Sequence, residues 1–206
     1  MAAFTYDAAS GRYRAEGGRF VPDAQVRAAV DAVADASSER MAALAQRLRA
    51  GSMPLAEFQA GMMAEVRVAH LANGIAAYGG VDQLSQANYG FMGRLIRDEY
   101  ARVRTFAADI AEGRQPLDGR LDNRAKMYGA QSRQTFSAVT ARERALRGAQ
   151  QERNVLGKGD SCDLCRAQSA RGWVGMGALV PPGRRTCLSR CNCYLTYRAE
   201  PIEVAA

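Results

Sequence analysis

Apolar residues recur at helical spacing along most of the chain, beginning at residue 23. The first apolar stripe precedes Gly51 and consists of Val26, Val30, Val33, Met41, Leu44 and Leu48. Ser52 and Pro54 begin a second stretch, which ends at Gly79, because proline fits the first turn of a helix and glycine its end. Two further stretches cover about residues 82–112 and 117–149. We therefore expect a mainly α-helical chain, with an elongated helical bundle as a domain over residues 23–150.

The first 22 residues lack this helical spacing. Glycine and serine separate four aromatic residues there, which are Phe4, Tyr6, Tyr13 and Phe20. The pattern fits either a short hairpin or an extended arm that becomes ordered on a partner. We predict an extended N-terminal arm over residues 1–22 and expect its four aromatic side chains to dock on another protein.

The helical pattern also stops after Gln150. Residues 152–157 and 193–198 read as strands, and residues 172–183 contain the glycines and prolines of tight turns. This stretch has too few large apolar residues to fold by burial alone. We predict a small β-rich module over residues 151–200, followed by a tail at 201–206, and expect a further element to stabilise it.

Every cysteine of the chain lies in this module. Cys162 and Cys165 form a C-x-x-C motif, and Cys187, Cys191 and Cys193 form a second cluster. Two such clusters in a module without its own core are typical of structural zinc, which takes four ligands in a tetrahedron. Zinc contributes about 10–16 kcal/mol to the folding of such modules. We predict that four of the five cysteines bind Zn²⁺, namely Cys162, Cys165 and Cys187 with either Cys191 or Cys193, since the last two point to opposite faces of an extended segment.

Disulfide and redox chemistry fit these cysteines less well. The N-terminus lacks the basic start and apolar run of a secretory signal, so we expect a cytoplasmic chain, in which disulfides are rare. Five is also an odd number of thiols. A redox C-x-x-C opens the helix of a βαβ unit, and we expect no such helix at Cys162.

The net charge of +7 comes from arginine, since all of the 28 basic residues except Lys126 and Lys158 are arginine. Six arginines lie in or beside the cysteine module: Arg166, Arg171, Arg184, Arg185, Arg190 and Arg198. Trp173 and Tyr194 suit base stacking, so nucleic-acid binding by a zinc protein is the alternative function. Its contact residues, for nucleic acid or another partner, would be Arg184, Arg185, Arg190 and Trp173. We prefer the interpretation in which these arginines lie hydrated or ion-paired on the surface of the module and Trp173 forms its small core. The basic residues are spread along the whole chain rather than gathered in a run.

Patterns typical of enzymes are missing from the sequence. The only histidine, His70, lies in an apolar-rich helix, where we expect it at the edge of the core. A zinc protease, a zinc deaminase and a di-iron site each need histidine motifs that one histidine cannot supply. Glu65, Asp98 and Glu99 read more simply as a solvated helix face than as an acidic active site. We therefore predict no enzymatic activity and, since no run of about 18 apolar residues occurs, a soluble protein without a membrane span.

The cysteine module resembles the C-terminal part of phage Mu F-like head morphogenesis proteins, the minor head proteins of tailed phages. The shared features are the C-x-x-C motif, a turn region with Pro182 and Gly183, and a cluster that ends in C-x-C before a short strand. Many members have His-Pro before that C-x-C, whereas this chain has Cys187 nearby, which would replace the histidine as a ligand. The resemblance covers about 50 residues.

This resemblance implies a structural virion protein, present in low copy near the portal and acting in head morphogenesis or at the head–tail junction. It implies assembly in the cytoplasm of the bacterial host. The expected partners are portal, capsid or neck proteins and further copies of the chain. Contact with packaged DNA remains open at this point.

Overall fold

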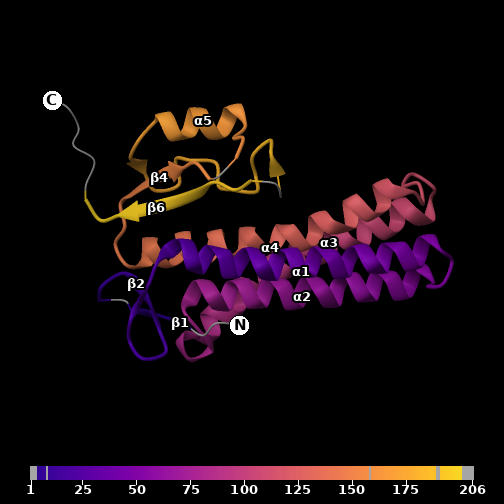
Figure 1. Ribbon diagram of the computed structural model, residues 1–206, viewed down its shortest axis with the longest axis horizontal. Helices are drawn as coiled ribbons and strands as arrows, with labels where there is room; N and C mark the ends of the chain where they lie inside the picture. The colour runs from indigo at the N-terminus through magenta and orange to yellow at the C-terminus, as the bar shows by residue number, and fades with distance from the viewer. Residues whose placement is uncertain (1–3, 8, 158, 189–190, 201–206) are drawn as a thin grey trace.

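The computed structural model describes residues 4–7, 9–157, 159–188 and 191–200, and most of these residues are helical. The long helices are α1 (Asp23–Arg49), α2 (Leu55–Tyr78), α3 (Gln86–Ala111) and α4 (Gly119–Leu146), with a short 3₁₀ helix η1 (Val81–Gln83) before α3. They lie along the long axis of the molecule (Figure 1). The prediction of a mainly helical chain is therefore confirmed. No helix within these ranges combines the length and the hydropathy that crossing a membrane would require.

The helix ends follow local capping chemistry. Ser85 Oγ accepts a hydrogen bond from the Asn88 N–H at 3.3 Å, so α3 starts four residues later than the expected boundary at 82. Asp118 caps α4 in the same way through the Arg120 N–H. Gly79 ends α2 with a φ of 86°, and a Cβ at this position would lie 2.1 Å from the Tyr6 nitrogen. A glycine is therefore needed at Gly79 both for its backbone conformation and for the close approach of the N-terminal strand.

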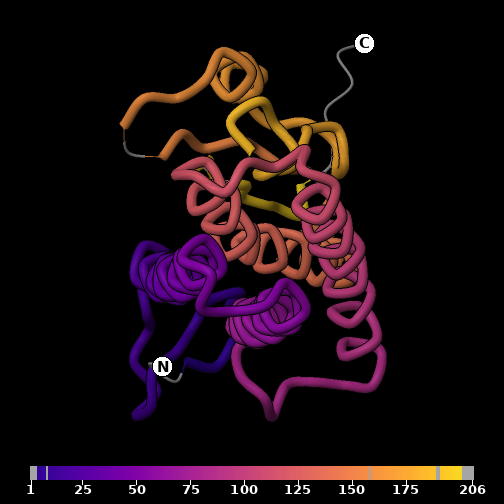
Figure 2. Tube along the Cα trace, turned by 90° about the vertical axis from the view of Figure 1, so that its right-hand side faces the viewer, coloured from indigo at the N-terminus to yellow at the C-terminus, as the bar shows by residue number. Residues whose placement is uncertain are grey.

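The main core lies between the four long helices. Phe58 of α2 and Phe106 of α3 meet edge to face, with ring centroids 5.7 Å apart, and Tyr128 of α4 stacks on Phe106. Elsewhere in the bundle, α1 and α4 approach each other closely at Gly129. A Cβ atom at this position would lie 2.4 Å from the Ser38 nitrogen. Figure 2 shows α4 between the α1–α2 pair and the C-terminal module. Helix α4 thus holds both the bundle and the module in place.

A polar seam runs through the bundle between α2 and α4. His70 Nδ1 lies 2.7 Å from Thr135 Oγ1, and Asn73 donates to Ser132 Oγ at 2.9 Å. The sequence suggested a position at the edge of the core for His70, but its side chain is only 2% exposed. Burial, followed by repulsion from Arg102, lowers the pKa of His70 to about 4, so the ring is neutral near pH 7.

The N-terminal segment forms a small antiparallel sheet in the order β1-β2-β3. Its strands are β1 (Phe4–Asp7), β2 (Arg12–Ala15) and β3 (Phe20–Val21). Phe4, Tyr6 and Tyr13 are buried against Val26 of α1, and the Tyr13 hydroxyl donates to the Ala77 carbonyl at 3.1 Å. The expected extended arm is therefore wrong, and the hairpin alternative is nearer to the structure.

The physical reason is a turn that brings these aromatic residues onto one face. Asp7 accepts hydrogen bonds from the Ala9 and Ser10 N–H groups, and Gly11 with a φ of 69° completes the reversal. The chain's own helices then bury the aromatic face. Phe20 stays half-buried, with the guanidinium group of Arg14 4.1 Å from its ring centroid.

The C-terminal module is a three-stranded antiparallel sheet with one helix. Its elements are β4 (Gln151–Val155), α5 (Asp163–Ala170), β5 (Val174–Gly175) and β6 (Tyr194–Arg198), and the strand order is β5-β4-β6. Strand β6 lies against α4, and the module sits beside one end of the bundle (Figure 1). The two expected strands correspond to β4 and β6. Helix α5, which begins directly after Cys162, was not expected, although its sequence DLCRAQSA consists largely of good helix formers.

Candidate metal centre

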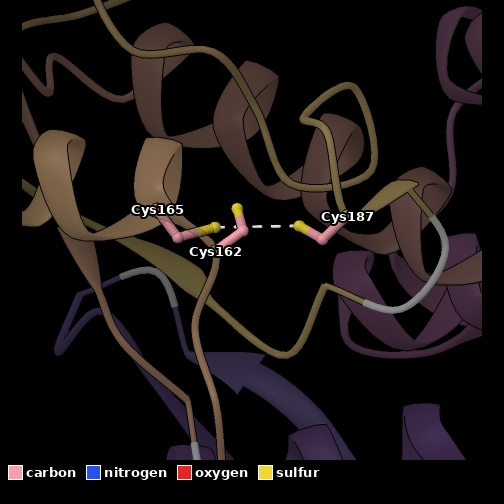
Figure 3. A group of neighbouring side chains, drawn as sticks. All are labelled: Cys162, Cys165 and Cys187. Atoms are coloured by element: carbon pink, nitrogen blue, oxygen red, sulfur yellow. Dashed lines mark hydrogen bonds between the residues drawn. The ribbon is translucent and has the colours of Figure 1, made fainter.

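The strand pairing of the module brings the two cysteine clusters together. Val155 at the end of β4 pairs with Tyr194 at the start of β6, so the residues that follow β4 meet those that precede β6. Cys162 stands at the N-terminus of α5 and Cys165 lies in its first turn. Figure 3 shows that the sulfur atoms of these two residues and of Cys187 lie close together.

Two sulfur–sulfur distances from Cys165 match those of a tetrahedral metal site. Cys165 Sγ lies 3.7 Å from Cys187 Sγ and 3.8 Å from Cys191 Sγ. Four sulfur atoms about 2.3 Å from a central zinc ion are separated by about 3.8 Å, which follows from the geometry of a tetrahedron. A disulfide bond would need about 2.0 Å. All five cysteines lie within the described residues and are free thiols.

Cys165 belongs to both groups of thiols that are close enough to share an ion. One group consists of Cys162, Cys165 and Cys187, the other of Cys165, Cys191 and Cys193, and within each group the sulfur atoms lie within 4.8 Å of one another. Cys165 is also the most buried of the five, at 1% exposure. The site is therefore centred on Cys165, with more thiols around it than one tetrahedral ion can use.

Cys191 and Cys193 do not point to opposite faces, as an extended segment would require. Leu188 has a φ of 46°, and the Cys191 N–H donates to the Leu188 carbonyl at 3.2 Å. Cys191 and Cys193 lie just before β6, and both thiols are buried beside Cys165. Cys193 Sγ also lies 3.8 Å from Ser161 Oγ, which gives this thiol a polar neighbour outside the cysteine cluster.

Arg185 is a buried cation beside the thiols. Its side chain is 1% exposed, donates to the Val180 carbonyl at 2.7 Å and to Asn154 Oδ1 at 2.8 Å, and places Nη1 3.4 Å from Cys165 Sγ. Within the described part of the chain, no carboxylate forms an ion pair with Arg185. A guanidinium group stays protonated, and a buried charge is costly unless it is compensated. The neighbouring Cys165 sulfur, as a thiolate, would supply that negative charge.

The surroundings of the thiols affect their acidity in opposite directions. A hydrogen bond with Thr186, assisted by the Cys165 N–H, lowers the pKa of Cys162 to about 6. Burial raises the pKa of Cys187 to about 11 and raises that of Cys165 further. These thiols would therefore not ionise together near neutral pH by themselves. A divalent cation at their centre would stabilise all of the thiolates at once.

Buried polar residues that the sequence pattern did not single out fix the position of the cysteines. Asn154 of β4 donates to the Cys165 carbonyl at 3.0 Å and accepts from Arg185. Gln168 of α5 accepts from the Val180 N–H at 2.6 Å. Asn154 lies in the expected strand, but its polar side chain there gives no signal of burial, so the sequence alone could not identify this role.

The residues expected to contact nucleic acid are scattered by the fold. Arg185 is buried and cannot reach a surface ligand, which corrects that expectation, whereas Arg184 is exposed. Trp173 is half-buried, and its ring lies 4.6 Å from the Arg198 guanidinium carbon and 5.3 Å from that of Arg153. Arg190 lies outside the described residues.

The acidic residues of the helices do not converge either. Glu65 pairs with Arg40 on the surface. Glu99, expected on a solvated face, is instead buried at 6% exposure, and burial raises its pKa despite an ion pair with Arg102.

No family model, curated protein or solved structure matches this chain. The cysteine cluster, Arg185 and the polar residues around them are therefore the structural basis for assigning a function.

Proposed function

We propose that the C-terminal module is a structural zinc module in which four thiolates bind one Zn²⁺. The proposal is carried by the distances of 3.7 and 3.8 Å from Cys165 Sγ to the sulfur atoms of Cys187 and Cys191, which are those of a tetrahedral thiolate site. Cys162 would complete the set, since its sulfur atom lies within 4.8 Å of those of Cys165 and Cys187. Cys191 belongs to the other group around Cys165, so the two groups would close around the ion when it binds. Cys193 is the spare thiol, because it has Ser161 as an alternative neighbour.

Zinc suits this donor set better than other common ions. Thiolates are soft ligands, and tetrahedral sulfur sites select zinc or iron–sulfur clusters, whereas magnesium and calcium take oxygen. Four thiolates leave no open position for water or substrate, so the ion would stabilise the module rather than catalyse a reaction. We therefore propose a structural role for the whole chain rather than an enzymatic one.

We further propose that the chain is a structural virion protein of a tailed phage, a minor head or neck component. The support is the resemblance of the cysteine module to Mu F-like head morphogenesis proteins, together with the proposed role of Cys187 in place of their histidine. A long helical bundle with a zinc-stabilised module at one end presents extended surfaces for portal, capsid or neck proteins and for further copies of the chain. The protein would be assembled in the host cytoplasm and retained in the virion.

Elemental analysis of the purified chain with a count of reactive thiols tests the zinc site. We expect about one zinc per chain and one reactive thiol, rising to five on addition of a chelator. Cys193→Ser should retain the metal and abolish the single reactive thiol, whereas Cys165→Ser should lose the metal. A metal-free chain with five reactive thiols would contradict the proposal. Retention of zinc by Cys191→Ser but not by Cys193→Ser would exchange the roles of those two cysteines.

Mass spectrometry and immunogold labelling of purified phage particles test the virion role independently. The expected result is a low-copy protein at the portal vertex. Its absence from both mature particles and assembly intermediates would contradict a structural role, whatever the outcome of the metal measurement.

A further inference from the structure

A cavity of about 570 Å³ lies where the two sheets meet the same end of the helical bundle. Its walls come from the N-terminal sheet, the first turn of α1, the C-terminal turns of α4 and strand β6 (Figures 1 and 2). Small-molecule sites in proteins occupy about 300–1,000 Å³. The cavity is therefore large enough for a ligand, and it does not include the cysteine cluster.

The charged residues that line this cavity are predominantly basic: Arg27, Arg144, Arg147 and Arg198, with Asp23. Arg198 is neutralised by Glu200 at 2.6 Å. Arg147 has only a long contact of 3.7 Å with Glu143, which pairs at 2.9 Å with another arginine. Within the described residues, Arg27 and Arg144 form no ion pair with a carboxylate. The cavity thus holds an excess of positive charge.

Aromatic rings cover the faces of the Arg27, Arg144 and Arg147 guanidinium groups, and their donors have no hydrogen-bond acceptor among the described residues. The ring of Tyr6 lies 4.3 Å from the Arg144 guanidinium carbon and 5.0 Å from that of Arg147. Arg27 lies 3.7 Å from the Tyr194 ring. An aromatic ring contacts the face of a guanidinium group. The five N–H donors of the guanidinium group point outward in its plane, away from the ring. Donors beside the cavity are therefore available to a ligand.

The guanidinium groups of Arg144 and Arg147 repel each other, and a bound anion would relieve that repulsion. Arg144 lies in the last turn of α4 and Arg147 is its C-cap residue, three positions later, so the two side chains leave the same end of the helix. Burial, followed by repulsion from Arg147, lowers the pKa of Arg144. The carbonyl end of α4 stabilises a nearby cation by about 0.3–1 kcal/mol, but it does not neutralise several of them.

The adjoining cavity shows how the same fold neutralises an arginine that needs no ligand. There Arg133 of α4 donates to Asp31 at 2.7 Å and to Asp35 at 2.6 Å, both on α1. One turn of α1 earlier, the corresponding position is Arg27 rather than an acidic residue. The absence of matching carboxylates around Arg144 is therefore a local property of this cavity and not of the whole interface.

We propose that the cavity bounded by Arg27, Arg144 and Arg147 binds the phosphate group of a ligand. Phosphate carries more charge than a carboxylate and offers oxygens to several guanidinium groups at once. The Thr140 hydroxyl also lines the cavity. It is buried without a hydrogen-bond partner among the described residues and can donate to a phosphate oxygen. The phosphate belongs either to a small free phosphate compound or to a nucleic-acid backbone.

Isothermal titration of the zinc-loaded chain with pyrophosphate tests the site, with citrate at equal ionic strength as the carboxylate comparison. We expect pyrophosphate to bind and the variant R144Q/R147Q to bind it at least tenfold more weakly. The variant R97Q/R104Q removes the same charge from exposed positions of α3 and should bind as the wild type does. Equal weakening in both variants, or equal binding of citrate, would overturn the proposal.

A measurement on the unaltered chain guards against a variant that fails to fold. Pyrophosphate should shift the amide resonances of Tyr6 and Tyr197, which line the cavity, and leave that of Val68 on the exposed side of α2 unchanged. Uniform shifts or none would overturn the site.

A short DNA duplex distinguishes the two sources of the phosphate group. If DNA competes with pyrophosphate and this competition is lost in R144Q/R147Q, the ligand is a nucleic-acid backbone. If R144Q/R147Q binds DNA as the wild type does, the ligand is a free phosphate compound. Zinc content is measured separately, so failure here does not affect the zinc proposal.

Discussion

Arg185 Nη1 lies 3.4 Å from Cys165 Sγ, inside a module where both side chains are 1% exposed. In the proposed site, four thiolates around one Zn²⁺ would carry a net charge of −2, and the guanidinium group would offset part of that charge. The same contact explains how an arginine remains buried without a carboxylate partner. The arginine and the thiolate centre therefore depend on each other.

Replacement of Arg185 by methionine should weaken zinc binding about 100-fold, equivalent to about 3 kcal/mol, because it leaves buried negative charge without its cation. Chelator competition measures this affinity. Arg184→Met is the matched control, since the adjacent side chain is exposed and its loss should change stability by less than about 0.5 kcal/mol. Equal affinities for the two variants would show that Arg185 is only a packing residue.

Removal of the metal should unfold the C-terminal module and leave the helical bundle folded. Trp173 is the only tryptophan of the chain and lies in this module, packed near Arg198. A chelator should therefore shift its fluorescence to longer wavelength, while the far-ultraviolet circular dichroism signal of α1 to α4 remains largely unchanged. Readdition of zinc should reverse the shift. Cooperative loss of both signals would indicate that the bundle cannot fold without the module.

Replacement of Gly129 by alanine should destabilise the bundle by about 3 kcal/mol, because the new methyl group meets the Ser38 backbone, which cannot move independently of α1. Urea unfolding measures the change. Gly93 lies in α3, and a Cβ at this position would have no neighbouring atom within 4 Å, so Gly93→Ala should stabilise the chain by about 0.5–1 kcal/mol through helix propensity. The two substitutions are chemically identical and should differ in sign. A destabilising Gly93→Ala would refute the assignment of that position to an open helix face.

Stability should fall as the pH decreases below about 6.5, in part through His70. Burial lowers the folded-state pKa of His70 to about 4, so below the unfolded value the unfolded chain binds a proton that the folded chain does not. The loss from this group reaches about 2 kcal/mol at pH 5. Urea unfolding at pH 7 and pH 5 measures it.

The cysteine module should also become less stable in acid, since the pKa of Cys162 is lowered in the folded chain and the proposed zinc ligands become protonated. His70→Gln provides the comparison, because it removes only the histidine titration. The variant should lose about 2 kcal/mol less than the wild type between the two pH values. Equal losses of stability in His70→Gln and in the wild type would show that the pKa of His70 is not lowered in the folded chain.

The long helices could be predicted from the sequence because their apolar period, glycine stops and capping residues are local properties. The start of α3 at Gln86 rather than at residue 82 depends on the Ser85 cap, which also has a local signal. The cysteine clusters could likewise be recognised from spacing. Their convergence on Cys165 depends on the pairing of β4 with β6, for which the strand patterns gave only an indication.

The remaining features depend on contacts distant in sequence. Arg184 and Arg185 are chemically identical neighbours, yet only Arg185 is buried, because Asn154 and Cys165 come from other elements to meet it. The aromatic residues around Tyr13 signalled that a surface must cover them, but not that this surface belongs to the same chain. Buried polar contacts and intramolecular docking are the two features that local patterns could not resolve.

Both sheets lie at one end of the bundle, whereas the α1–α2 and α3–α4 turns lie at the other (Figure 1). The molecule is therefore a rod with chemically different ends. One end carries the cysteine cluster and the arginine-lined cavity, and the other end consists of two helical hairpins. If copies of the chain associate side by side in the same orientation, we expect all their cysteine-bearing ends to lie on one rim. A cross-linker introduced at the hairpin turns would report on such packing without disturbing either sheet.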